Sequence, residues 1–187
     1  MRAQLFPAIM MTVMLTVLLG LCYPLAITGI AQVLFPHQAN GSLIVDNGKT
    51  VGSELIGQPF TDPGHFWSRP SATSPQPYNA ASSSGSNLGP TNQALIDQVK
   101  QNVAALRQAD PSNTAPIPVD LVTNSGSGLD PDISVAAALY QVPRVARVRK
   151  LPVETVRNLV TQYTEGRQFG ILGEPRVNVL ELNRALD

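Results

Sequence analysis

The chain opens with a long apolar run that carries no charge. From Ala3 to Gln38 there is no Lys, Arg, Asp or Glu, and Leu5 to Phe35 is almost entirely apolar. As a helix this run would be about 46 Å long, whereas the hydrocarbon core of a bilayer is about 30 Å thick. The pattern predicts one transmembrane helix from about Pro7 to Ile30, with the remainder of the run tilted or beyond the core. In its second half, Pro24 would remove a backbone hydrogen bond, and the small residues there are compatible with a partner helix.

The charges around this run favour a retained anchor over a cleaved signal peptide. Arg2 is the only charge before it, the run is about twice as long as a signal-peptide core, and no clean small-x-small site closes it. The only basic residue between the run and Arg69 is Lys49, so we expect a cytoplasmic N-terminus. The sequence thus predicts a single-pass anchor over residues 1–35 and an extracytoplasmic domain over residues 36–187.

Two short segments after the run predict a β-hairpin. Ser42–Asp46 and Thr50–Ile56 flank Asn47-Gly48, and both turn residues tolerate the positive φ of a type I′ turn. The hairpin also explains Gly48-Lys49-Thr50, which resembles the end of a phosphate-binding loop but has Leu43 where that motif needs glycine.

The next stretch, Gly57–Pro90, is dense in Gly, Pro, Ser, Thr and Asn, so it predicts no long helix or strand. It nevertheless carries Phe60, Phe66, Trp67 and Tyr78. The apolar area of these side chains needs a surface to cover. An ordered loop is therefore favoured over a disordered linker.

The rest of the chain alternates helical periodicity with breaks. We expect helices over Thr91–Ala109, from Asp130 as N-cap with Pro131 through Tyr140, over Val153–Tyr163 and over Val179–Leu186. Pro143 is expected to break or bend the second helix, and Val119–Thr123 is a short strand candidate. The predicted fold class is α+β: one N-terminal transmembrane helix, then a mixed outer domain with a small sheet and several helices that supply most of the core.

A turn pattern, S-G-S-x-L-x-P, occurs twice, at Ser84–Pro90 and at Ser125–Pro131. Each copy leads into a predicted helix. Glycines let the backbone amides turn inward, and a helix N-terminus adds unpaired N–H groups, so either copy could hold an anion or a partner's carboxylate. The alternative is that both are simply well-capped helix starts.

Composition narrows the functions further. Thirteen basic and thirteen acidic residues balance, which argues against nucleic-acid binding, and the single cysteine, Cys22, allows no internal disulfide. No serine lies in a G-x-S-x-G elbow, and His37 and His65 have no partners at metal-ligand spacing, so we expect neither a catalytic site nor a metal site. A basic cluster near the third predicted helix could meet acidic partner surface or lipid headgroups, or be a solvated face; it comprises Arg144, Arg147, Arg149, Lys150 and Arg157.

A series of segments along the outer part resembles one family, the C chain of the Kdp potassium-transporting P-type ATPase. The matching segments are Gly41–Ile44, Val51–Ser53, Gly57-Gln58, Phe66–Ala72, Ser84–Pro90, Ser125–Pro131, Gln141–Ala146 and Arg176–Asn183. In this order they are far more specific than any one motif. One departure is Asp132, which stands where the family usually has histidine, so a role for that imidazole does not carry over.

The resemblance implies a non-catalytic accessory subunit of an inner-membrane complex that imports potassium at the expense of ATP. Its partners would be the potassium-pore subunit, the ATP-hydrolysing P-type subunit and membrane lipid, and it would support assembly and coupling by docking on them. The sequence itself requires no cofactor.

The same resemblance implies an alternative, a catalytic chaperone that raises the pump's ATP affinity through a ternary complex with ATP. The family-matched candidates for a nucleotide contact are Gln141 and the turn of Ser125, Gly126, Ser127 and Gly128. An extracytoplasmic domain conflicts with that role, because it cannot reach cytoplasmic ATP. An anchored hydrolase is a third class, for which the sequence offers no nucleophile and base.

Overall fold

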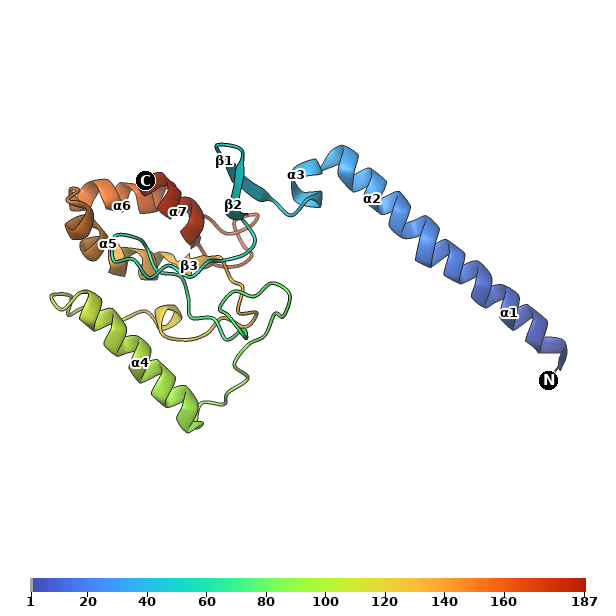
Figure 1. Cartoon of the computed structure of the whole chain (residues 1–187), viewed down its shortest axis with the longest axis horizontal. Coiled ribbons are helices and arrows are strands. Elements are labelled where there is room, and N and C mark those ends of the chain that lie inside the picture. The colour runs from blue at the N-terminus through green and yellow to red at the C-terminus, as the bar shows by residue number, and fades with distance from the viewer. Residues whose placement is uncertain (1) are drawn as a thin grey trace. The chain divides into compact units, whose positions relative to one another are not determined.

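The computed structural model describes residues 2–187, which form two compact units that are treated separately below. One unit runs to Leu43 and the other comprises Ile44–Asp187. The first unit is helical and the second mixes helices with short strands (Figure 1). The predicted fold class, a long apolar N-terminal helix followed by a mixed α+β part, is confirmed.

The first unit is one long helical rod of three segments. They are α1 (Arg2–Val17), the π-helical segment η1 (Leu18–Cys22) and α2 (Tyr23–Leu34), followed by the short helix α3 (Pro36–Ala39). Residues Gln4–Leu34 are long and apolar enough to cross a membrane, and none of their most apolar stretch is buried by the chain itself. The helix is longer than the expected Pro7–Ile30 and ends where Pro36 follows Phe35.

Pro24 does not break this rod, and η1 explains why. The N–H of Tyr23 donates to the carbonyl of Leu18, five residues back instead of four. A wider turn of this kind absorbs the local misfit that a proline ring imposes on an α-helix.

The β-hairpin is confirmed. Strands β1 (Leu43–Asp46) and β2 (Lys49–Ser53) pair around Asn47 (φ 49°) and Gly48 (φ 78°). Both turn residues adopt the left-handed conformation that the type I′ turn demands.

A second, antiparallel sheet lies at the centre of the larger unit. Its order is β3 (Asp132–Ser134), β5 (Arg176–Asn178), β4 (Thr164–Glu165), and Ile133 lies opposite Val177. The helices α5 (Val135–Arg149), α6 (Val153–Gln162) and α7 (Val179–Leu186) gather together in Figure 1. The most deeply buried apolar residues come mainly from these helices and from β3 and β5: Ile133, Ala137, Ala138, Val142, Val145, Ala146, Val156, Val160, Val177, Val179 and Leu182.

The helix α4 (Gln93–Ala109) confirms the helix predicted over Thr91–Ala109, although few of its side chains are buried. Leu106 is its only buried residue, while Val99 and Val103 pack against the core from its edge. Asp110 ends the helix, as expected. The helices predicted over Val153–Tyr163 and Val179–Leu186 are confirmed as α6 and α7.

Two local predictions are wrong. Val119–Leu121 is a 3₁₀ turn, η2, instead of a strand, because the Val119 carbonyl accepts bonds from the Val122 and Thr123 N–H groups and from the Thr123 hydroxyl. Those local bonds compete with pairing to a neighbouring strand.

The second helix also begins later than expected. The segment after Asp130-Pro131 is β3, and α5 starts at Val135 with Ser134 as its N-cap, whose Oγ accepts from Ala137 N–H at 3.0 Å. Asp130 instead accepts from the Asp132 N–H at 3.1 Å and pairs with Arg69 at 3.0 Å. Pro143 lies inside α5, which continues to Arg149, so the proline does not break the helix; Val142 and Val145 beside it are buried in the core.

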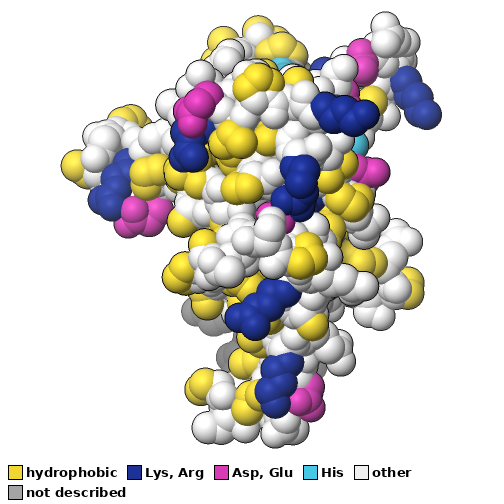
Figure 2. Space-filling model, turned by 90° about the vertical axis from the view of Figure 1, so that its left-hand side faces the viewer, with side chains coloured by type: hydrophobic (Ala, Val, Ile, Leu, Met, Phe, Trp, Pro, Cys, Tyr) yellow, Lys and Arg dark blue, Asp and Glu magenta, His cyan; other side chains and the backbone are white. Residues whose placement is uncertain are grey.

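The stretch Gly57–Pro90 is an ordered loop, as predicted. Phe66 is fully buried, and Trp67 packs against the core. On the face shown in Figure 2, basic and acidic side chains are interspersed with apolar ones, and neither sign of charge forms a continuous patch.

Replacing Ser134 by Ala should lower the free energy of unfolding by about 1 kcal/mol, because the Ala137 N–H at the start of α5 loses its acceptor. Urea unfolding followed by the emission of Trp67, the only tryptophan, measures the change. Ser134→Thr keeps a capping hydroxyl and should retain most of the stability. An Ala variant as stable as the wild type would show that α5 does not depend on this cap.

Candidate functional site

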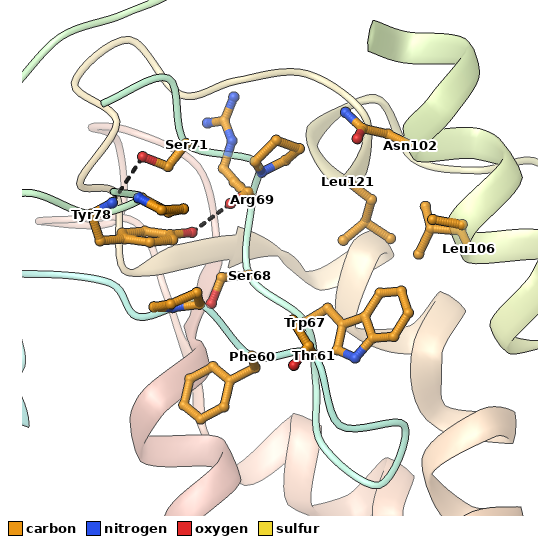
Figure 3. A pocket seen from close by; sticks show the side chains of 14 residues that line it. Phe60, Thr61, Trp67, Ser68, Arg69, Ser71, Tyr78, Asn102, Leu106 and Leu121 are labelled. Carbon is orange, nitrogen blue, oxygen red and sulfur yellow. Dashed lines mark hydrogen bonds between the residues drawn. The ribbon is translucent and has the colours of Figure 1, made fainter. Parts of the chain in front are cut away.

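The loop Gly57–Pro90 borders a cavity of about 270 Å³ (Figure 3). Phe60, Trp67 and Tyr78 line it from the loop, and Leu106 and Leu121 line it from α4 and η2. The Tyr78 hydroxyl donates to the Arg69 carbonyl, and burial raises the pKa of Tyr78 to about 12. This phenol therefore stays a neutral hydrogen-bond donor that ties the loop to itself.

Two side-chain amides hold the centre of this loop. Gln141 of α5 accepts from the Trp67 N–H at 2.7 Å and donates to the Trp67 carbonyl at 3.1 Å. Asn183 of α7 does the same to Phe66, accepting from its N–H at 2.7 Å and donating to its carbonyl at 2.9 Å. Two consecutive residues of an irregular segment thus have their backbone groups satisfied by side chains, as strand neighbours would do in a sheet.

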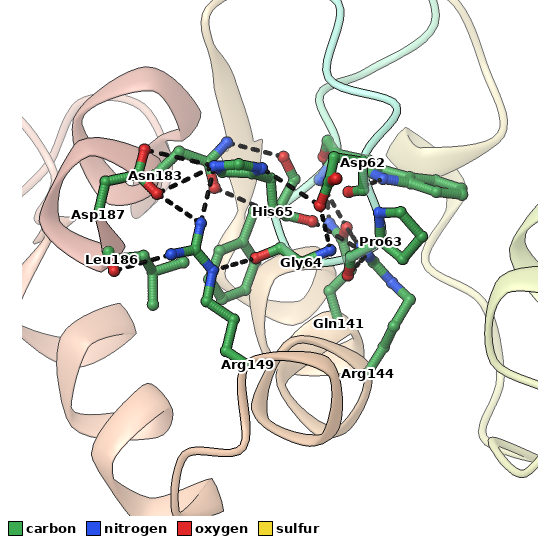
Figure 4. A network of polar contacts seen from close by, with 12 residues as sticks. Asp62, Pro63, Gly64, His65, Gln141, Arg144, Arg149, Asn183, Leu186 and Asp187 are labelled. Carbon is green, nitrogen blue, oxygen red and sulfur yellow. Dashed lines mark hydrogen bonds and ion pairs between the residues drawn. The ribbon is translucent and has the colours of Figure 1, made fainter.

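Arg144, one helical turn after Gln141 on α5, also contacts this loop. Its guanidinium donates to the carbonyls of Pro63 and His65 and to Gln141 Oε1, and it lies 4.5 Å from the centre of the Trp67 ring (Figure 4). Burial lowers the pKa of Arg144 to about 10, so it remains charged at neutral pH. The indole face and the carbonyl dipoles stabilise this cation.

Arg149 holds the other side of the same loop. It donates to the carbonyls of Gly64 (2.7 Å) and Leu186 (2.9 Å) and to the Asp187 carboxylate (2.6 Å). His65 lies within this group, with its Nε2 2.8 Å from Arg149 and 3.3 Å from Asp187 (Figure 4). The hydrogen bond from Arg149 lowers the pKa of Asp187.

The basic cluster predicted from sequence is only partly internal: Arg144 is buried and Arg149 half-buried, whereas the other three residues are exposed. Arg147 pairs at 2.8 Å with Asp110, whose side chain is almost fully buried, and Arg157 pairs with Glu154 one turn away on the exposed side of α6. Lys150 ends α5 in a left-handed conformation (φ 57°). Arg144 and Arg149 turn to the loop and so do not belong to a solvated basic face, whereas Arg147, Lys150 and Arg157 are exposed, as that alternative expects.

The two S-G-S turns contact each other. The Ser127 carbonyl accepts from the Ser84 N–H at 3.0 Å and from the Ser83 hydroxyl at 2.9 Å. A side chain on Gly85 would lie 2.7 Å from the Gly126 carbonyl, so this approach requires glycine. The second turn leads into β3 instead of a helix, and the first is separated from α4 by the N-cap Asn92. The prediction that each turn leads into a helix thus holds for the first turn, which α4 follows, and is wrong for the second.

The two nucleotide candidates, Gln141 and the turn Ser125–Gly128, contact the same short segment of the loop, at Trp67 and at Pro70. Gln141 binds Trp67, while the N–H of Ser125 donates to the Pro70 carbonyl at 3.3 Å and its Oγ accepts from the Gly128 N–H at 2.9 Å. Gln141 is 1% exposed and uses both amide atoms twice, toward Trp67, Arg144 and Ala137. A nucleotide contact at Gln141 or Ser125–Gly128 stays a prediction.

Asp132, which replaces the family's usual histidine, lies beside a second cavity of about 550 Å³. Its carboxylate pairs with Arg176 at 2.9 Å, and Arg176 also pairs with Glu165 at 2.6 Å. Burial raises the pKa of Asp132 to about 6, although Arg176 opposes the shift. Within residues 2–187, no group of three His, Cys, Asp or Glu side chains is arranged to hold a metal ion.

Sequence reasoning missed the role of Asn183 and the inward orientation of Arg144 and Arg149. A signal existed for Asn183, because it lies four residues after Val179 on the apolar side of α7, where a polar side chain needs a buried partner. Nothing in the local pattern of α5 distinguishes its buried arginine from its exposed ones.

Comparison with known proteins gives one consistent result. The family model for KdpC, the c chain of the K⁺-transporting ATPase, matches residues 5–187. The potassium-transporting ATPase KdpC subunit of Polaromonas naphthalenivorans is 65% identical over 187 residues, which cover 100% of this chain and 95% of that protein. Those of Dechloromonas aromatica (63%; 100% and 98% covered) and Methylococcus capsulatus (65%; 97% and 95% covered) are similarly alike.

Gln141→Leu should lower the free energy of unfolding by about 3 kcal/mol, because it leaves the Trp67 N–H and carbonyl without partners in a buried site. Gln101→Leu, on the exposed side of α4, is the matched control and should change stability by less than about 0.5 kcal/mol. Urea unfolding of both variants measures the difference. Equal stability of the two would contradict the structural role of Gln141.

The stability contributed by Asp132 should fall as pH rises. Its folded-state pKa of about 6 lies above the ordinary 3.8, so the folded chain binds the proton more tightly than the unfolded chain does. Its contribution is therefore complete below about pH 4 and lost through about pH 6. As pH rises from about 4 through about 6, the free energy of unfolding of Asp132→Asn should increase relative to that of the wild type. Urea unfolding at each pH measures this difference.

Asp187→Asn provides the control of opposite sign, since the pKa of Asp187 is lowered and its contribution is lost as pH falls. The difference between Asp132→Asn and the wild type should change with pH, and a constant difference from pH 4 to 7 would be incompatible with the raised pKa.

Proposed function

This chain belongs to the KdpC family, the c chain of K⁺-transporting ATPases, and on that basis we propose that it is a non-catalytic accessory subunit that supports assembly and coupling by docking on the pore and pump subunits. As a KdpC subunit it serves a potassium-transport complex and has one candidate membrane helix at its N-terminus. The finer role, as anchor and docking partner, is the proposal.

The observation that carries the proposal is the N-terminal rod. The stretch Gln4–Leu34 is apolar all round, and its most apolar part is not buried by the rest of the chain. A helix of this kind needs lipid or other helices around it, because every turn exposes large apolar side chains to the surroundings. A membrane shared with sister subunits supplies both.

A non-catalytic role is supported by the hydrogen bonds of the reactive side chains in the larger unit, which are made to the chain itself. His65 lies among Arg149 and Asp187, and Arg144 is directed at loop carbonyls. These groups stabilise the loop around Phe66 and Trp67. A docking unit needs such a fixed surface, because a preorganised surface loses less entropy on binding.

We further propose that the N-terminus is cytoplasmic and that residues 36–187 lie outside the cytoplasm, in a bacterial inner membrane. The charges that set orientation are Arg2 before the span and, after it, no basic residue until Lys49. The alternative, an ATP-binding chaperone, requires the opposite placement. It also requires Gln141 to exchange its bonds to Trp67 and Arg144 for bonds to a nucleotide.

A cysteine at an exposed position of α4 tests the orientation. In a Cys22→Ala background, Gln101→Cys should react with a membrane-impermeant maleimide in intact spheroplasts, and Ala3→Cys, the cytoplasmic control, only after lysis. The reverse pattern would overturn the proposed topology and favour the chaperone.

Docking is tested separately from orientation. With an affinity tag on the ATP-hydrolysing subunit, detergent-solubilised membranes should retain the wild-type chain at a fixed ratio after extensive washing. Loss of the chain under conditions that keep the pore and pump subunits together would contradict an accessory subunit.

A further inference from the structure

The segment between β4 and β5 forms an ordered turn at the surface of the larger unit. Gln168 and Leu172 exchange two backbone hydrogen bonds, each 2.9 Å long, and enclose Phe169 (φ 54°) and Gly170 (φ 75°). At its base, Arg167 donates to both carboxylate oxygens of Glu174, at 2.8 and 2.7 Å. We call residues 167–174 the apolar tip.

Three large apolar side chains of this tip are exposed to different degrees. Phe169 is 92% exposed, Ile171 75% and Leu172 53%. Isolated exposed apolar residues are common on protein surfaces, but a contiguous group of three is typical of an interaction site. The outer unit has no larger cluster of such residues within a single turn in the part of the chain that is described.

The backbone of the tip adds a second observation. A phenylalanine with positive φ is unfavourable, because its bulky side chain crowds the backbone in the left-handed conformation. Asparagine or glycine would fit the same position better. The fold thus keeps a large, exposed apolar side chain at a position of the turn where local stability favours a small polar one.

We propose that the apolar tip is a docking element that inserts Phe169, Ile171 and Leu172 into an apolar pocket on another protein subunit of the same pump. This rests on the proposed accessory role and names the surface through which the outer unit docks. Protein interfaces usually have aromatic and aliphatic residues at the centre, where they fill pockets, and polar residues at the rim. In the tip, the ion pair of Arg167 and Glu174 would be part of that rim.

Charge argues for a protein partner over a lipid surface. Arg2 is the only charged residue before Asp46, so the outer unit carries twelve basic and thirteen acidic residues, a net charge of −1. The basic residue of the tip, Arg167, is paired with Glu174. Membrane-inserting segments normally combine apolar residues with basic ones that attract anionic lipid, and the tip has no such surplus.

Rigidity leads to the same conclusion. The two backbone hydrogen bonds between Gln168 and Leu172 hold the tip in a turn, and Arg167 Nη2 contacts both Glu174 oxygens at its base; an ordered turn loses less entropy on fitting a shaped pocket. A fluid lipid surface gives no advantage to a fixed shape.

Photo-crosslinking in the assembled pump identifies the occupant. With p-benzoylphenylalanine in place of Phe169, irradiation of native membranes should give a covalent adduct between this chain and a sister subunit. The same probe in place of Val119, which is 71% exposed on a different segment, is the control and should give much less adduct. Adducts to lipid only, to a second copy of this chain only, or equal yields at both positions would overturn the proposal.

A competition experiment measures the contribution of the tip without unfolding it. The double variant Phe169→Asn and Ile171→Thr removes the apolar side chains, while Asn suits the positive φ and keeps the turn. Coexpressed with a distinguishable wild-type chain, it should be retained on the tagged ATP-hydrolysing subunit at least about tenfold less. Val119→Ser should compete equally.

Equal retention of the double variant would overturn the role of the tip while leaving the accessory function intact. Failure of the wild-type chain to be retained would instead contradict the proposed function itself, so the two outcomes are distinguishable.

Discussion

The backbone of Phe66 and Trp67 is held by two side-chain amides, and most of the larger unit depends on this contact. Gln141 from α5 and Asn183 from α7 bind adjacent residues, so the loop joins two helices that are far apart in sequence. Phe66 can then fill the core, and Trp67 can lie under Arg144. Without the amides, four buried backbone groups would lack partners, and an irregular loop could not lie inside a core.

The arginines around this contact show how a polar loop is built into an apolar unit. Arg144 and Arg149 are directed mainly at the carbonyls of Pro63, Gly64 and His65. A guanidinium has five donors in a fixed fork, so one side chain can satisfy several carbonyls that no neighbouring strand reaches. The loop thus keeps its shape without secondary structure.

Much of the fold could be predicted from local sequence patterns, whereas contacts between residues far apart in the sequence could not. The hairpin, the long apolar helix and α4, α6 and α7 follow from turn chemistry and periodicity. The start of α5 was misplaced because Asp130-Pro131 and Ser134 are both good helix-start signals, and pairing of Ile133 with Val177 decides between them. Gln141 was singled out only by family resemblance, and its contact with Trp67 spans 74 positions.

The bond between Phe66 and Asn183 joins residues 117 positions apart, which sets an order of events during synthesis. Phe66 is synthesised 117 residues before Asn183, so its backbone N–H and carbonyl lack these partners while that length of chain is added. Contacts of such long range form slowly, because loop closure costs entropy before any bond repays it.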